Sequence, residues 1–347
     1  MKKLIAVLAI VCLISGVAFA QIGATIHGGA FLMANDGDDI VAGGSMSRVR
    51  LDGSGESEDG KYGGYLRAQA DDFWGFAWWK PIDQFMIRIG SNGGDNFWGK
   101  EGVTGWGFYQ VAGDVGVAQA GNVWGGGYLY YADSDPAVKY RDIFFGGWDN
   151  GIMLEIKPID ILAINIGLPF AKSGAEVADF YQASTLQIDV NLDFGNIALT
   201  VEGLNDKAKI YFYFGLGAIE NLSLDVGFSY DLGTELAAAG LGAKYSFSDS
   251  FALKFRAAAS FGSKKTAYEK VGLLVDAMPI IGISDAMTAF VSLGLSMYDD
   301  QMNFHFNPYL QIGEEWGPSF WVGFQLFSTN NMKDMNWGIP IGINFSF

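Results

Sequence analysis

The chain is built largely of segments in which apolar and polar residues alternate one by one. In TLQIDVNLDF, residues 185 to 194, every second side chain is apolar and those between are polar. Successive side chains of a strand point to opposite faces, so this order predicts a strand with one apolar face and excludes a helix. The same order recurs at 209–217, 221–230, 251–261, 287–297, 303–312, 319–327 and 338–347. Each segment is about as long as the ten residues of a tilted membrane-spanning strand.

Short and long connections alternate between these segments. The short ones lie at 80–83, 157–160, 194–196, 219–221, 248–250, 283–285 and 314–317. The longer, polar ones include 170–180, 261–268 and 327–335. Short turns at one end and long loops at the other are typical of outer-membrane barrels, whose short turns face the periplasm. The stretches FAWWKPIDQFMIRIG and IMLEIKPIDILAINIG share the sequence KPID, and they predict two hairpins of one design.

The number of strands follows from adding the N-terminal part of the chain. A strand at about 22–33, a hairpin at 46–70 and a short strand at 73–80 bring the total to about 16 to 18. We favour 18, which leaves both termini on the periplasmic side, although it requires a very tight turn at 71–73. The predicted fold is one all-β domain over 21–347, a transmembrane antiparallel up-and-down β-barrel. A soluble β-sandwich also alternates, but its outward face is polar, and here charge is almost absent from the apolar face.

The N-terminus predicts export from the cytoplasm. MKKLIAVLAIVCLISGVAFAQ has two lysines, an apolar run from Leu4 to about Val17 and a small-x-small site ending at Ala20. These features describe a secretory signal peptide at 1–20. A retained membrane anchor is the alternative, but it needs about 20 apolar residues. Cys12, in the middle of the run, is the only cysteine, so the mature chain has no disulfide and no thiolate site.

Composition and charge favour a β-barrel over a helical membrane protein and argue against a nucleic-acid partner. Half of the 347 residues are hydrophobic, and 48 are glycine. No apolar run after residue 20 is long enough for a spanning helix, which leaves the closed barrel, whose backbone polar groups pair between strands. Without the two lysines of the signal, 20 basic residues face 38 acidic ones, a formal charge of −18. Such an acidic chain is not expected to bind nucleic acid.

Charged residues within the strands are expected to face the inside of the barrel. A lysine or arginine that faces lipid at the midplane costs roughly 2 to 4 kcal/mol. The expected inward-facing residues are Arg88, Glu155, Lys157, Asp189, Asp193, Glu202, Lys209, Asp225, Lys244, Lys254, Arg256, Asp276 and His305. A barrel of this size is too wide for side chains to fill. Most of these residues are therefore expected simply to solvate the wall of a water-filled space.

Four arginines form a more specific candidate. The mature chain has six, and Arg48, Arg50, Arg67 and Arg88 fall on three of the first five predicted strands, all in inward register. Neighbouring strands lie about 4.8 Å apart, so the four guanidinium groups are expected to form one basic wall. The longest irregular stretch, residues 92–142, follows directly. A loop of that length is usually functional, and its aromatic residues argue against disorder.

The order of these features resembles that of the bacterial general-diffusion porins. The shared features are a signal peptide, a strand with R-x-R, a glycine-rich hairpin, an arginine on the fifth strand, a long loop, and hairpins that end in Phe347. The resemblance implies that loop 92–142 folds into the barrel and places Asp95, Glu101 and Asp114 opposite the arginine wall. It also implies that Phe347 belongs to a signal read by the outer-membrane assembly machinery. The acidic P-E-F-G-G type loop sequence of that family is not visible here.

The predicted function is passive diffusion of small hydrophilic solutes and ions through a water-filled channel. Opposed acidic and basic walls orient dipolar solutes without any chemistry, so we expect no cofactor, no metal and no catalytic residue. The overall charge favours cations and the arginine wall favours anions, which leaves the ion preference open. The apolar outer face, in contact with outer-membrane lipid, allows a homotrimer without requiring one.

The sequence also raises three alternative functions. Hydrolysis would require a nucleophile and a base, and although Asn307 follows His305 in register, no G-x-S-x-G motif accompanies them. A surface adhesin or binding protein would use loops such as 35–39 and 53–60, whose acidic residues attract divalent cations. A specific channel for sugars or nucleosides would use inward-facing aromatic side chains for stacking. The candidates for stacking are Tyr65, Tyr211, Tyr213 and Trp321.

Overall fold

The computed structural model describes residues 19–36, 38–69, 72–91, 150–169, 184–204, 207–265, 269–298, 301–314, 318–329 and 331–346. These residues form strands joined by turns. The strands are β1 (Phe19–Asp36), β2 (Asp39–Glu56), β3 (Tyr62–Gln69), β4 (Asp72–Ile82), β5 (Phe85–Ser91), β6 (Asn150–Ile159), β7 (Leu162–Pro169), β8 (Thr185–Leu192), β9 (Gly195–Glu202), β10 (Lys209–Leu216), β11 (Leu222–Asp231), β12 (Leu236–Ser248), β13 (Phe251–Phe261), β14 (Gly272–Ser284), β15 (Met287–Tyr298), β16 (Gln301–Gly313), β17 (Ser319–Gly323), β18 (Gln325–Thr329) and β19 (Asp334–Ser346).

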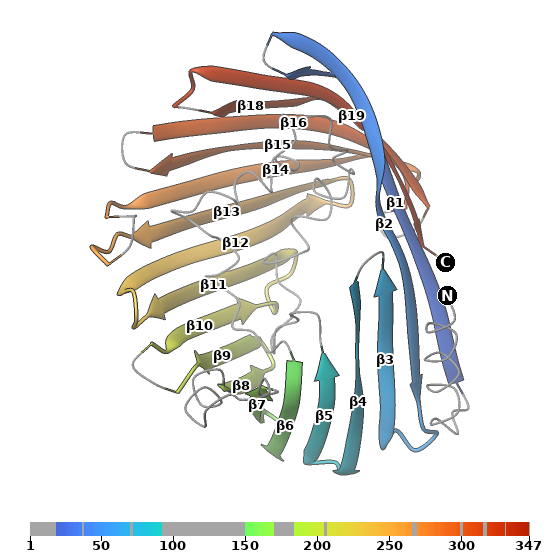
Figure 1. The fold of residues 1–347 in the computed structure, drawn as a ribbon, viewed down its shortest axis with the longest axis vertical. Coiled ribbons are helices and arrows are strands. Elements are labelled where there is room, and N and C mark those ends of the chain that lie inside the picture. The colour runs from blue at the N-terminus through green and yellow to red at the C-terminus, as the bar shows by residue number, and fades with distance from the viewer. Residues whose placement is uncertain are drawn as a thin grey trace.

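The strands form one antiparallel sheet that closes on itself. From β1 to β17 each strand pairs with the next along the chain, and β19 pairs with β1, so the first and last strands lie side by side (Figure 1). β17 and β18 are separated only by Phe324, and both pair with β16 and with β19, so they share one place in the ring. The prediction of an all-β, antiparallel up-and-down barrel is confirmed. Among the described residues the strands number 19 rather than the favoured 18, because of the break at Phe324.

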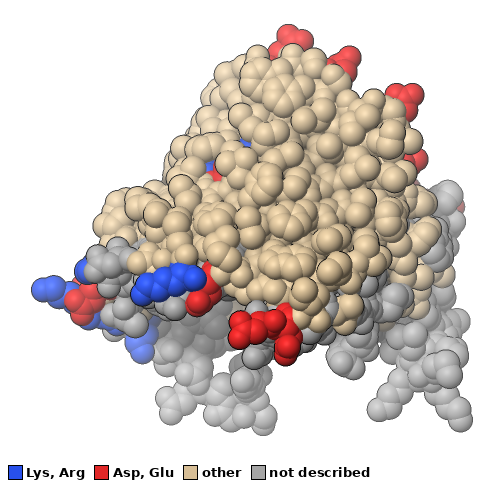
Figure 2. All heavy atoms as spheres, turned by 90° about the horizontal axis from the view of Figure 1, so that it is seen from above, with Lys and Arg blue, Asp and Glu red and all other residues tan. Residues whose placement is uncertain are grey.

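The two faces of the sheet are the reverse of those of a water-soluble protein. Polar side chains such as Gln187, Asp189 and Thr200 are buried, with exposed fractions of 0 to 3%. Their strand neighbours Ile188 and Leu199 are exposed by 37 and 42%. Figure 2 shows a broad uncharged outer surface with charged side chains gathered at its edges. A soluble sandwich would place these apolar rows inside, so the outer surface is suited to lipid.

The two KPID hairpins share one geometry, but their turns lie later than predicted. β4 and β6 continue through the proline to Ile82 and Ile159, and the turns occupy residues 83–84 and 160–161. In each hairpin the register shifts just before the turn, between Trp79 and Ile82 and between Ile156 and Ile159. Proline has no N–H to donate to the ladder, so it is accommodated at such an irregularity. The design is shared, as predicted.

Two paired glycines mark the point where the longest predicted loop leaves the sheet. Gly90 on β5 pairs with Gly151 on β6, and their φ angles are 140° and 153°. An added Cβ would lie 2.7 Å from the Cα of Phe76 at the first position and 2.8 Å from the Cα of Pro169 at the second. Only glycine fits both the backbone conformation and the space. The predicted loop 92–142 that follows, the signal residues 1–18 and Phe347 lie outside the described residues.

Candidate functional site

The first polar cluster of the inner face joins β2 and β3. Arg50 Nε lies 2.8 Å from one carboxylate oxygen of Asp52, and Arg67 Nε lies 2.5 Å from the other. The hydroxyl of Tyr65 also donates to Asp52. Asp52 was not among the predicted site residues, although it follows Arg50 by two positions and therefore shares its face. The predicted basic wall thus has an acidic group built into it.

Aromatic rings on β4 hold the arginines of this wall. The Arg67 guanidinium lies 4.7 Å from the ring centroid of Trp74, and that of Arg88 lies 4.4 Å from the ring centroid of Phe76. Both distances are within the range of cation–π attraction. β4 lies between β3 and β5, so its rings connect Arg88 to the cluster around Asp52. The side chain of Arg48, the fourth predicted member, lies outside the described side chains.

A second cluster lies on β7, β8 and β9. Asp189 accepts hydrogen bonds from Asn165 Nδ2 at 2.8 Å and from Gln187 Nε2 at 2.7 Å. Gln187 in turn accepts one from the Thr200 hydroxyl at 2.8 Å. All four side chains are at most 4% exposed. A buried polar chain of this kind is held in one arrangement, because each broken bond would leave a desolvated group.

Other predicted residues continue this polar face on either side. On β6, Lys157 Nζ lies 2.9 Å from Glu155. On β9 and β10, Tyr211 donates to Glu202 at 3.1 Å, and Lys209 is directly opposite Glu202 in the sheet. These carboxylates and ammonium groups therefore stand on one continuous wall with the Asp189 cluster.

A third cluster crosses β13, β14, β15 and β16. Arg256 forms an ion pair with Asp276, and His305 Nε2 lies 3.3 Å from the other oxygen of Asp276. The three side chains are exposed by 0, 0 and 4%. Gly294 on β15 lies between Asp276 and His305 in the sheet, and its missing side chain leaves the room for their contact. Lys254 precedes Arg256 by two residues on the same face.

Of the predicted site residues, Arg50, Arg67, Asp189, Arg256 and His305 lie in these clusters, and Glu155, Lys157, Glu202 and Lys209 lie on or next to the strands of the second one. The acidic loop residues Asp95, Glu101 and Asp114 lie outside the described part of the chain. In the described ranges, no three His, Cys, Asp or Glu residues are grouped in a way that could hold a metal ion. Those ranges also contain no helix long and apolar enough to cross a membrane.

Comparison with known proteins gives a fold. No family model matches the chain, and no curated protein matches it. A variant of the Rhodopseudomonas blastica porin with five substitutions is 12% identical, with a TM-score of 0.55 over 95% of this chain and 100% of that one. A triple mutant of the same porin is 13% identical, with a TM-score of 0.53 over the same shares. The anion-selective porin from Comamonas acidovorans is 10% identical, with a TM-score of 0.53 over 95% of this chain and 99% of that one. The chain therefore has the fold of the bacterial porins.

Proposed function

We propose that this protein is a bacterial outer-membrane porin, a water-filled channel through which small hydrophilic solutes and ions diffuse passively. The observation that carries the proposal is the closed ring of strands with charged residues on its inner face and apolar residues on its outer face. Such a ring satisfies every backbone group within the membrane. An interior of this width holds water rather than a packed core.

The inner wall supplies selectivity through fixed charge. Among the described residues, Arg50, Arg67 and the neighbouring Arg88 outnumber Asp52, and the ion pairs and aromatic rings described above contact them. Fixed charges along a pore attract one sign of ion and orient dipolar solutes. This cluster is the proposed basic side of the pore. Asp95, Glu101 and Asp114 remain the proposed acidic side, and no residue is assigned a catalytic role.

The apolar outer surface supports the proposed location in the outer membrane and is compatible with a homotrimer. Its exposed apolar side chains include Val226, Phe228, Leu293 and Leu295, each 37 to 43% exposed. A row of this kind suits outer-membrane lipid and also allows a homotrimer. Recognition of Phe347 by the assembly machinery and cleavage after Ala20 complete the proposal.

Single-channel recording in a planar bilayer tests this function. The refolded mature protein should give ohmic conductance steps, with a reversal potential in a salt gradient that shifts toward cation preference when Arg50, Arg67 and Arg88 are changed to Gln. The same exchange at Lys333, which lies on an exposed turn, should leave the reversal potential unchanged. A correctly folded barrel that passes no current would contradict the proposal and favour a closed scaffold for adhesion.

A further inference from the structure

Exposure to water divides the inner wall into two parts. On β2, β3 and β6, the side chains of Asp52, Arg67 and Lys157 are exposed by 21, 24 and 44%. On β13 and β14, the side chains of Arg256 and Asp276 are both 0% exposed. All five residues belong to the polar inner face described above. A side chain that lines a water-filled passage keeps some accessible surface, so only the first three meet this condition.

The exposed charged side chains lie on neighbouring strands between β2 and β6. Arg88 on β5 is partly exposed, and so is the polar side chain of Ser54 on β2. Exposure falls on either side of this part of the sheet. Thr25 on β1 is 6% exposed. On β6 the side chain of Glu155 is 19% exposed, whereas Asn165, directly opposite it on β7, is 4% exposed.

The buried part of the wall is not confined to one end of the barrel. Thr200 on β9 and Asn307 on β16 are 1 and 5% exposed. Ser292 lies in the middle of β15 and is 0% exposed. Ser260 lies one residue from the long-loop end of β13 and is 2% exposed. These inward-facing polar side chains are therefore closed to water at more than one depth.

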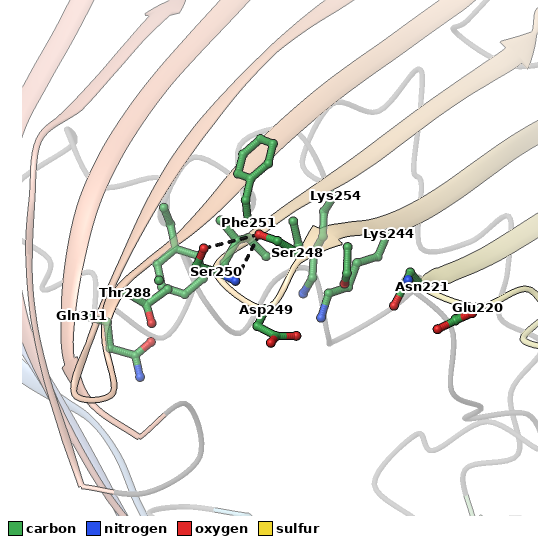
Figure 3. Close-up of a pocket in the computed structure, with 15 residues that line it drawn as sticks. Glu220, Asn221, Lys244, Ser248, Asp249, Ser250, Phe251, Lys254, Thr288 and Gln311 are labelled. Atoms are coloured by element: carbon green, nitrogen blue, oxygen red, sulfur yellow. Dashed lines mark hydrogen bonds between the residues drawn. The ribbon is translucent and has the colours of Figure 1, made fainter.

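A recess of about 540 Å³ at the short-turn end is the place where this buried part opens to solvent. Figure 3 shows side chains from the β12–β13 hairpin and from β15 and β16 around it. Along β13 its lining reaches Lys254, and along β15 it reaches Phe290. The next inward-facing residues on these strands, Arg256 and Ser292, are 0% exposed. Along these two strands the recess therefore ends before the third cluster.

We propose that solutes cross the barrel along the β2–β6 part of the inner wall, in contact with Asp52, Arg67, Glu155 and Lys157. Glu155 and Lys157 are then specificity-determining residues in addition to the arginines. The second and third clusters lie off this path, and their paired, buried polar groups hold the wall in one arrangement. The inference rests on the proposed channel function and adds which residues the solutes contact.

Reaction of introduced cysteines with a charged, membrane-impermeant methanethiosulfonate reagent tests this path. The mature chain has no cysteine of its own, so each variant carries a single thiol. Ser54→Cys on β2 and Ser292→Cys on β15 are matched exchanges at inward-facing serines, one partly exposed and the other 0% exposed. Lys157→Cys on β6 and Ser260→Cys on β13 repeat the comparison. The full-length mature protein is refolded into lipid vesicles, and mass spectrometry measures the modified fraction over time.

Ser54→Cys and Lys157→Cys should react in the folded barrel. Ser292→Cys and Ser260→Cys should react at least about 100-fold more slowly, because a buried thiol reacts only after a local opening, and this factor corresponds to an opening free energy of about 2.8 kcal/mol. In urea all of these variants should react alike, which controls for the reactivity of the thiols. In a planar bilayer the reagent should reduce the current through Ser54→Cys channels and leave the current through Ser292→Cys channels unchanged.

The modification rates separate this inference from the porin proposal, because mass spectrometry does not require conduction. Reaction of Ser292→Cys or Ser260→Cys as fast as that of Ser54→Cys would overturn the inference. Protection of both Ser54→Cys and Lys157→Cys in a conducting channel would also overturn it, with the porin function intact. A barrel that shows the expected rates but passes no current would support the placement of the water-filled passage and refute the channel.

Discussion

Replacing Gly294 by alanine should destabilise the barrel strongly. Gly294 lies on β15 between Asp276 on β14 and His305 on β16. A Cβ there would lie 2.7 Å from His305 Nε2, and closer still to Asp276 Oδ1 and to His305 Cε1. All of these atoms belong to fully or almost fully buried side chains. The new methyl group therefore has to displace Asp276 or His305.

The expected loss of unfolding free energy follows from overpacking at this position and from the ion pair that Asp276 forms. Overpacking alone costs about 1 to 3 kcal/mol. Displacement of Asp276 would also break its ion pair with Arg256, which is 0% exposed, and breaking a buried pair costs about 3 to 5 kcal/mol. We therefore expect Gly294→Ala to lower the free energy of unfolding by about 4 kcal/mol, within the range set by these two effects.

Urea unfolding in lipid vesicles, followed by tryptophan fluorescence, measures this change. The matched control is Gly53→Ala on β2, where an added Cβ would meet no atom within 4 Å. Because glycine weakens a strand interior by roughly 0.5 to 1 kcal/mol relative to alanine, the control should be neutral or slightly stabilising.

A double substitution, Arg256→Met with Asp276→Ala, tests whether the clash with Asp276 and the loss of its ion pair cause the destabilisation. It removes the ion pair and the closest clashing oxygen, so Gly294→Ala should cost much less in that background. The reasoning is refuted if Gly294→Ala unfolds at the same urea concentration as the wild type, or if its cost is undiminished in the double variant.

Three further predictions follow from other parts of the wall. Asp52→Asn removes the carboxylate that two arginines share, so the reversal potential should shift toward anion preference at a stability cost of about 1 kcal/mol; an unchanged potential would show that this cluster does not line the conducting path. Gly90→Ala should lower the free energy of unfolding by about 1 to 3 kcal/mol, because its φ is 140° and an added Cβ would meet the backbone of β4; wild-type urea stability would contradict this. In the β2–β3 turn, the Ser57 hydroxyl donates to Asp59 at 2.7 Å and is the main cause that lowers the pKa of Asp59. A lowered folded-state pKa stabilises the turn above the usual carboxyl range, and this stabilisation is lost as the pH falls through the folded pKa. Ser57→Ala should therefore move the Asp59 pKa back up in an NMR titration of the carboxyl carbon, and an unmoved pKa would show that the hydrogen bond is not its cause.

The period of two along the chain was enough to predict the strands and their faces. β13 has the predicted bounds at both ends, and β15 and β16 differ by one or two residues. The turns near Pro81 and Pro158 were placed too early, because a strand can absorb a proline at a register shift, and the sequence pattern does not show where that shift falls. Asp52 could have been found from the sequence, since its spacing from Arg50 places both on one face.

The partners of each inward-facing residue depend on the assembled ring. Arg256, Asp276 and His305 are each on the predicted face, but their contact requires a register that puts Gly294 between two of them. The register between strands also places Lys244 opposite Lys254 and Arg67 opposite Trp74. Alternation in the sequence specifies which face a side chain takes, because that depends only on its own strand. Register between strands depends on turn length, on bulges and on closure of the ring, so only the tertiary structure decides which charges meet.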